Sequence, residues 1–242
     1  MADPIHAESM SAIEKAFHSL QHYTLFEFQL FGQEIVIRNT IFVSWVAMLM
    51  IVAFSVVLTK KLSVNRPGKL QCIAEIFVDM VNGLCKSSIG HHYKPFVAYI
   101  GSLLMFLAVS NMIAIFNFIP GLHLYPPAKD ITVTGTLAII SICVVIFAGF
   151  KYKGVKGWLK GLADPMPLMI PFKLLEYFTK PLSLCLRLFG NVLAAFIIMK
   201  LILNIVPYLG APFAMFFDMF DGILQAFIFI YLTSIYIGEA VE

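Results

Sequence analysis

The stretch PLSLCLRLFGNVLAAFIIMKLILNIV, residues 181–206, decides the fold class of this chain. It is apolar almost throughout, yet Arg187 places a guanidinium group inside it. Even the part from Leu182 to Val206 would be about 37 Å long as a helix, more than the ~30 Å hydrocarbon core of a bilayer. Such a segment must tilt, kink or lie partly along the membrane.

The composition of the whole chain supports a membrane protein. Of its 242 residues, 60% are hydrophobic and only 13% are charged, far from the averages of soluble domains. The net charge of +3 is spread over span borders and forms no basic face, so we expect no nucleic-acid partner. The four cysteines, Cys72, Cys85, Cys143 and Cys185, show no C-x-x-C spacing. We therefore predict no disulfide, no metal site and no cofactor.

Hydropathy along the chain predicts an all-α integral membrane protein with about five transmembrane helices and one amphipathic interfacial helix. The spans are expected at about 37–59, 95–119, 131–150, 171–206 and 212–237, and the interfacial helix at about 69–88. Residues 1–36 are expected to form an outer-side N-terminal segment and residues 37–242 a single membrane domain. The N-terminus has no basic region followed by an apolar one, so it is not a cleavable signal peptide.

Two lysine clusters set the expected orientation. One covers residues 60–69 and the other residues 151–160, each directly after an apolar run. By the positive-inside rule both are cytoplasmic, which leaves the N-terminus outside, the loop at residues 123–130 outside and the C-terminus cytoplasmic. Lys200, close to the outer end of its helix, is expected to snorkel to the interface.

Arg187 is the principal candidate functional residue. An arginine at mid-helix costs about 2.5–3.5 kcal/mol on insertion scales, so something must compensate its charge. Glu176 is about three helical turns away and is a poor local partner. Two alternatives remain: a buried pair with a carboxylate on another helix, such as Asp218, or a partner that is mobile or belongs to another protein. In the last helix, spacing places four polar residues near one face, which marks a candidate ion pathway: Asp218, Asp221, Gln225 and Tyr236.

The string KPLSLCLRLFGN, residues 180–191, resembles the signature of subunit a of F-type ATP synthases. The resemblance extends to Ser110-Asn111, to residues 130–134 and 224–229, and to Tyr236-Ile237-Gly238-Glu239. It implies a stator ion-channel subunit of bacterial type, in which two half-channels couple proton translocation to rotation of a ring of c subunits. The implied partners are this c-ring, subunit b of the peripheral stalk, the rest of the complex and the lipid of a bacterial inner membrane.

The resemblance also implies residue roles. Arg187 is the essential ion-coupling arginine, with Ser183 and Asn191 beside it on the ion pathway. Gln225 matches a glutamine near the arginine, and Asp218 occupies an outer-channel position. Asp221 and Tyr236 are kept as ion-pathway candidates. A long tilted helix pair is expected to pack against the ring. On its Arg187 helix, Leu184, Leu188 and Ala195 are expected to meet the ring.

The sequence departs from the family pattern at two positions. Phe196 stands where many bacterial members carry a channel glutamate, and Lys173 stands where an inner-side acid is common. Glu176, one turn further on, is expected to substitute for that acid. Na⁺ in place of H⁺ is the alternative coupling ion, since the ion ligands belong to the ring.

Two other classes of function compete with this interpretation. A free-standing channel or secondary transporter is disfavoured because transporters commonly show repeated halves, and no repeat is found. A membrane enzyme is disfavoured because the apolar segments contain no histidine, His91, His92 and His123 lying near their borders. We therefore expect no catalysis by this chain alone.

Overall fold

The computed structural model describes the backbone of residues 24–30, 33–60, 68–113, 126–163, 170–205 and 207–241. The expected N-terminal segment falls largely outside these ranges, as do residues 123–125 of the loop at 123–130. The side chains of Phe196, Lys200 and Asp218 are also outside the described part, although their backbones are helical. The expectations that concern these three side chains therefore stay predictions.

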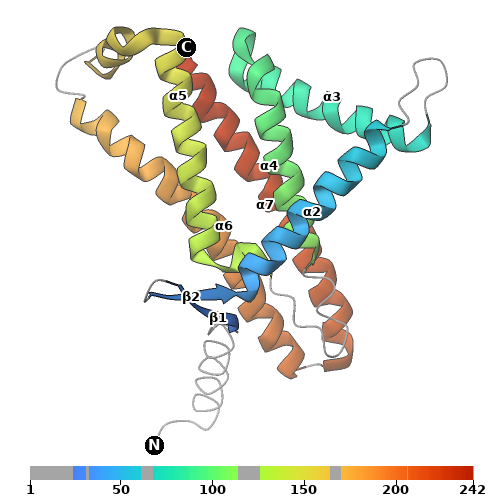
Figure 1. The fold of residues 1–242 in the computed structure, drawn as a ribbon. Coiled ribbons are helices and arrows are strands. Elements are labelled where there is room, and N and C mark those ends of the chain that lie inside the picture. Colours follow the sequence, from blue (N-terminus) through green and yellow to red (C-terminus); the bar gives the residue numbers. More distant parts are fainter. Residues whose placement is uncertain are drawn as a thin grey trace, which may run out of the picture.

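Six α-helices make up the described part of the membrane region (Figure 1). They are α2 (Asn39–Thr59), α3 (Lys69–Ile89), α4 (Lys94–Met112), α5 (Ile131–Ala163), α6 (Ile170–Ile205) and α7 (Pro207–Val241). Short 3-10 turns, η1 (Gly90–His92) and η3 (Pro127–Lys129), precede α4 and α5. The prediction of an all-α integral membrane protein is confirmed for this region.

Four described segments are long and apolar enough to cross a membrane by length and composition. They are Asn39–Thr59, Lys94–Met112, Ile131–Gly154 and Met219–Val241. α6 is not among them, and several side chains of its second half, Phe196 and Lys200 included, lie outside the described part. The fifth span, and the exact span boundaries, therefore stay predictions.

A β-hairpin precedes the helices and was not predicted. Strand β1 (Thr24–Leu30) pairs antiparallel with β2 (Gln33–Arg38), and α2 begins directly after it at Asn39. The alternation of apolar and polar residues in TLFEFQL and QEIVIR is a strand signal that analysis by hydropathy alone overlooks.

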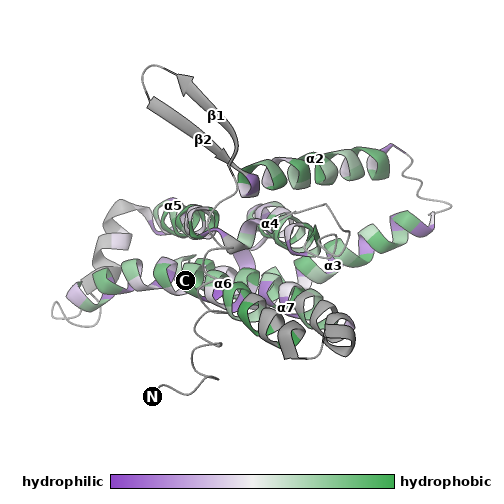
Figure 2. Cartoon of the chain, turned by 90° about the horizontal axis from the view of Figure 1, so that it is seen from below, coloured by the Kyte–Doolittle hydropathy of each residue, from purple (hydrophilic) through white to green (hydrophobic). Residues whose placement is uncertain are grey.

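The helices form layers when the bundle is seen from below (Figure 2). α2 lies on one side, α4 and α5 lie in the middle, and α6 and α7 run together on the far side. α2 is apolar around its whole circumference and buries little of it, with Val43 and Ala47 packed on Ile113. Its exposed surface is that of a lipid-facing helix.

The main core lies where α3, α4, α5, α6 and α7 meet, and its largest enclosed side chains include Ile100, Leu188 and Phe229. α3 runs across the end of the bundle at a steep angle to α4 (Figure 1). Only its C-terminal half packs on the core, through residues such as Val81 and Cys85, as expected for an interfacial helix.

A buried carboxylate joins α2 to the start of α5. The hydroxyl of Thr40 donates a hydrogen bond of 2.9 Å to Asp130, and the backbone N–H of Thr132 donates another of 2.9 Å. An acidic side chain that accepts from the first turn is a typical N-cap of a helix. Asp130 therefore fixes the entry of α5 beside α2.

Candidate functional site

Arg187 lies on the exposed face of α6. Ser183 and Asn191, one turn to either side, are exposed with it, as is Leu186. The opposite face of α6 enters the core. Arg187 makes no hydrogen bond or ion pair with the part of the chain that the structure describes. Pairing with Asp218 is untested, because that side chain lies outside this part.

The expectation that Leu184 and Leu188 meet a partner ring is wrong. Leu184 is 2% exposed and Leu188 is fully buried, and both belong to the main core. Residues four apart lie on one face of a helix, so Leu184, Leu188 and Val192 form a single stripe turned toward α5 and α7. Ala195 is half-buried. The outward face of α6 instead presents Arg187 among exposed apolar side chains.

Asn191 connects α6 to α7 one turn from Arg187. Its side-chain amide donates to Asp221 at 2.8 Å and to Gln225 at 3.3 Å. Asp221 and Gln225 lie one turn apart on α7, and so both reach the same amide. The structure thus brings together three of the residues that the sequence singled out, and gives Asp221 a bonding partner that sequence analysis could not assign.

Gly222, one turn before Gln225 on α7, makes a polar contact with α4. The side-chain amide of Asn111 donates to the backbone carbonyl of Gly222 at 2.8 Å. Near the two ends of this hydrogen bond, three buried side-chain atoms have no hydrogen-bond partner among the residues that the structure describes: the Gln225 Nε2, the Asn111 Oδ1 and the Ser110 Oγ. Buried polar atoms normally bind protein or ordered water, so this contact is polar and not merely apolar packing.

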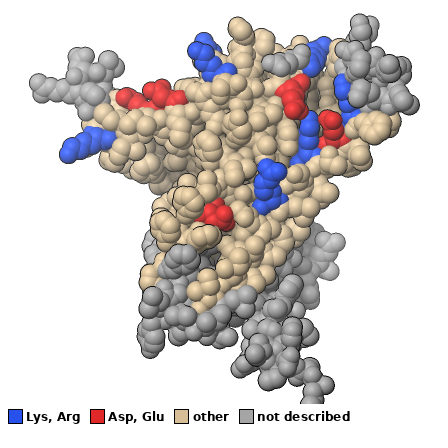
Figure 3. Space-filling model, turned by 180° about the vertical axis from the view of Figure 1, so that it is seen from behind, with Lys and Arg blue, Asp and Glu red and all other residues tan. Residues whose placement is uncertain are grey.

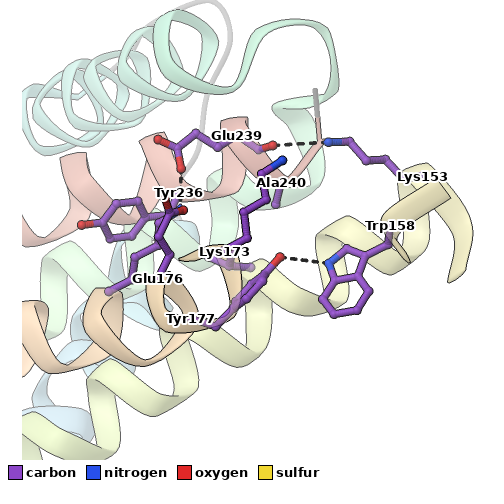
Figure 4. Close-up of a pocket in the computed structure, with 10 residues that line it drawn as sticks. Lys153, Trp158, Lys173, Glu176, Tyr177, Tyr236, Glu239 and Ala240 are labelled. Atoms are coloured by element: carbon purple, nitrogen blue, oxygen red, sulfur yellow. Dashed lines mark hydrogen bonds and ion pairs between the residues drawn. The ribbon is translucent and has the colours of Figure 1, made fainter. Parts of the chain in front are cut away.

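A second polar cluster surrounds a cavity of about 230 Å³ between α5, α6 and α7 (Figure 4). Its lining includes Lys153 and Trp158 of α5, Lys173, Glu176, Tyr177 and Lys180 of α6, and Tyr236, Glu239 and Ala240 of α7. Glu176 and Tyr236 therefore lie here and not in the group around Asn191. This cavity lies at the end of the bundle where α5 ends, α6 begins and α7 ends, which is the lysine-bearing end of the bundle. Charged side chains of the described residues gather toward this end (Figure 3).

An ion pair crosses this cavity. Lys180 donates to the carboxylate of Glu239 at 2.6 Å, lies 3.7 Å from the carboxylate of Glu176, and has its ammonium 5.0 Å from the ring centre of Tyr236. Lys153 donates to the backbone carbonyl of Glu239 at 3.4 Å. Sequence analysis missed Lys180 and Glu239, because each looks like an ordinary charge at a helix border until packing joins them.

The described residues contain no group of three or more His, Cys, Asp and Glu side chains that could hold a metal ion. His92 stacks on Tyr152 with ring centres 4.6 Å apart, which gives it a packing role. The arrangement places the cation of Arg187 on the exposed face of α6. Carboxylates lie on either side of it along the bundle, Glu176 in one direction and Asp221 in the other. These features define a class: multi-pass helical membrane proteins that move ions.

Comparison with known proteins narrows this class. Residues 41–238 match the family model described as ATP synthase A chain. Over 214 residues the chain is 33% identical to "ATP synthase subunit a, sodium ion specific" of Propionigenium modestum, an alignment that covers 84% of this chain and 73% of that protein. The chain therefore belongs to the ATP synthase A chain family and is an ion-translocating membrane subunit of an F-type ATP synthase. The resemblance noted in the sequence is confirmed.

Proposed function

We propose that Arg187 is the ion-coupling residue of this subunit and separates two half-channels beside a rotating c-ring. The observation that carries the proposal is the position of Arg187, exposed on the outward face of α6 and without an ion-pair partner among the described residues. A charge on an apolar outward surface is costly in lipid. A partner subunit that brings its own carboxylates past this face would compensate that cost.

The chemistry of arginine suits this role. A fixed positive charge favours the ionised form of a carboxyl that approaches it, so each ring site gives up its ion before passing Arg187. Arginine stays protonated at any physiological pH, so it does not relay protons itself. The two half-channels therefore remain separated at this residue.

The remaining ion-pathway residues are assigned by their position along the bundle. Asp218 and Gln225 line the outer half-channel in this proposal, and Asn191 and Asp221 hold the polar group beside Arg187. Ser183 lies on the outward face of α6 on the other side of Arg187. Glu176 and Tyr236 belong to the inner side, where Glu176 replaces the acid absent at Lys173.

The translocated ion is proposed to be H⁺. Na⁺ is the second candidate, because the relative from Propionigenium modestum is described as sodium ion specific. ATP-driven transport by the purified complex in vesicles distinguishes the two ions. Transport that requires Na⁺ and persists when a protonophore is present would establish Na⁺. Transport that is independent of Na⁺ and collapses with the protonophore would establish H⁺.

The assembly and location follow from the same proposal. The outward face of α6 and α7 meets the c-ring, subunit b and the rest of the complex hold the chain as part of the stator, and ATP chemistry takes place elsewhere. The membrane is a bacterial inner membrane, with residues 1–36 outside and residues 37–242 as one membrane domain. The two lysine clusters then face the cytoplasm.

Replacing Arg187 tests the proposal. Arg187→Ala and Arg187→Gln are expected to abolish both ATP synthesis and ATP-driven ion pumping while the complex still assembles, because no positive charge then discharges the ring sites. Lys200→Gln is the matched control, since it removes a cation from the same helix. A purified Arg187→Ala complex that pumps ions near the wild-type rate would refute the role given to Arg187.

A further inference from the structure

The cavity between α5, α6 and α7 contains charges that the family resemblance did not assign. Glu239, from the end of α7, is 54% exposed, and Glu176, from α6, is 60% exposed. Lys180, which binds both, is only 20% exposed. The two carboxylates, labelled in Figure 4, are therefore more exposed than the Lys180 ammonium that binds both of them.

Stability alone does not account for this arrangement. Ion pairs with an exposed partner contribute little to folding, since water screens them. Lys180 is nevertheless held between Glu239, Glu176 and the ring of Tyr236. The geometry holds two carboxylates close together at the mouth of a cavity, an arrangement that suits an ion path.

The cavity leads toward Arg187 along one face of α6. Glu176, Lys180, Ser183 and Arg187 are spaced by four, three and four residues, so they form a single stripe. Lys180 and Arg187 are about 10 Å apart along the helix axis. Ser183, the residue between them, is exposed and polar.

No comparable route runs through the interior that the structure describes. Leu184, Leu188 and Ile237 are at most 2% exposed and close the space between α6 and α7. The hydroxyls of Thr233 and Ser234 are bonded to carbonyls of their own helix at 2.9 Å each. Any ion path from the cavity therefore follows the outward face of α6, where a partner subunit would complete its wall.

We propose that this cavity is the inner entrance of the ion path and that Glu239, positioned by Lys180, is the carboxylate at which the translocated cation exchanges with inner-side water. The inference rests on the proposed function and deepens it. For H⁺, the Glu239 carboxylate accepts a proton arriving from the ring side and releases it to water, so the carboxylate is restored. In ATP-driven pumping the same proton moves in the opposite direction.

Glu239→Gln tests this exchange in the whole complex reconstituted in vesicles. The variant is expected to slow ATP-driven pumping about tenfold or more, as loss of a proton-transferring group commonly does. Its dependence on inner-side ion concentration is expected to shift, while its dependence on the outer side stays unchanged. Glu239→Asp should keep most of the activity, and Glu75→Gln, an exposed carboxylate of α3, should behave as wild type.

The double variant Lys180→Gln/Glu239→Gln separates this role from a structural one. If the pair only stabilises the fold, removing both charges restores pumping per assembled complex. Any remaining change in the dependence of pumping on ion concentration would then be the same on the two sides of the membrane. Under our proposal the double variant stays slow with the inner-side shift. Restored pumping would overturn it.

Thiol labelling gives a second readout that needs little loss of activity. Ala240→Cys, at the wall of the same cavity, in a complex whose other cysteines are replaced, should be blocked by an impermeant cationic thiol reagent on the inner side and not on the outer side. Failure to block, or block from outside, would contradict the proposal. Normal pumping by Glu239→Gln with no pumping by Arg187→Ala would reject only this inference, whereas normal pumping by Arg187→Ala would reject the proposed function itself.

Discussion

At the scale of single residues, α6 shows how one turn of helix changes what a side chain does. Leu188 is fully buried, whereas Arg187 beside it is exposed and Asn191 reaches across to α7. The presence of an arginine at this position indicated a functional ion site, because a cation in the middle of an apolar helix is costly in a membrane. The rotation of α6 about its axis could not be read from spacing, since both faces are apolar. That is why the face expected to meet the ring was assigned incorrectly at Leu184 and Leu188.

The two acids of α7 have different predicted roles, and their asparagine variants separate them. Asp218→Asn is expected to cause a large loss of ATP synthesis with normal assembly, because the outer half-channel then lacks its charge. Asp221→Asn is expected to act more mildly, because an amide can still accept from Asn191 at the same place. ATP synthesis by reconstituted complexes at varied outer pH measures both. Normal coupling by Asp218→Asn together with failure of Asp221→Asn would move the channel to Asp221.

At the scale of elements, the long apolar helices were predictable and their ends were not. The third span was expected to end near Phe150, and the apolar segment ends at Gly154, whose φ of 68° interrupts α5 in the left-handed region that favours glycine. A second helical stretch of α5 then runs to Ala163. α7 begins at Pro207, and Pro212 lies inside it. Hydropathy reports where lipid surrounds the chain, whereas helices continue into the interface wherever backbone hydrogen bonds allow.

The cross-helix ion pair at the inner cavity could not be found by sequence analysis for a related reason. Lys180 and Glu239 are 59 residues apart, and only the packing of α6 against α7 brings them within 2.6 Å. In the sequence each of them is a charged residue near the end of an apolar run. Most apolar runs end in this way, so the pattern does not single these two residues out. The group around Asn191 was more accessible, since Asn191 lies four residues from a rare arginine and Asp221 and Gln225 lie four residues apart in the last helix.

Helix contact also predicts which glycines cannot be replaced. A Cβ at Gly238 of α7 would overlap the backbone carbonyl oxygen of Ser88 in α3, so backbone must move. Gly238→Ala is expected to destabilise the helix contact by about 1–3 kcal/mol, as overpacking does. Gly83→Ala is the control, because its Cβ would meet open space and alanine favours a helix by up to about 1 kcal/mol. Heat-induced loss of the purified complex should occur earlier for Gly238→Ala only; equal midpoints would contradict the contact.

At the scale of the whole molecule, charged side chains of both signs gather at one end of the bundle. Lys153 of α5, Lys180 of α6 and Glu239 of α7 are in contact, so the end of α5, the beginning of α6 and the C-terminus share one side. This agrees with the orientation that the lysine clusters predict. Arg187 lies about two turns further along α6 from that end, between the cavity beside Lys180 and the polar group around Asn191.

This arrangement makes membrane sidedness the decisive test of the architecture. Single cysteines in place of Lys60 and Lys151 are expected to react with an impermeant thiol reagent only from the cytoplasmic side, and a cysteine in place of Lys129 only from outside. Cys72 is exposed and is replaced by serine in all three variants, as are Cys143 and Cys185.

Cys85 can remain as an internal control in those variants. It is buried in the core, and burial raises the pKa of its thiol from 9.0 to about 11, which leaves about a hundredfold less reactive thiolate near pH 8. It should label only after denaturation or as the pH rises toward that pKa. Labelling of Lys60→Cys and Lys151→Cys from outside would invert the orientation. Labelling of these two from opposite sides would show that the number of crossings between them is odd, so either α3 also crosses the membrane or α4 and α5 do not both span it.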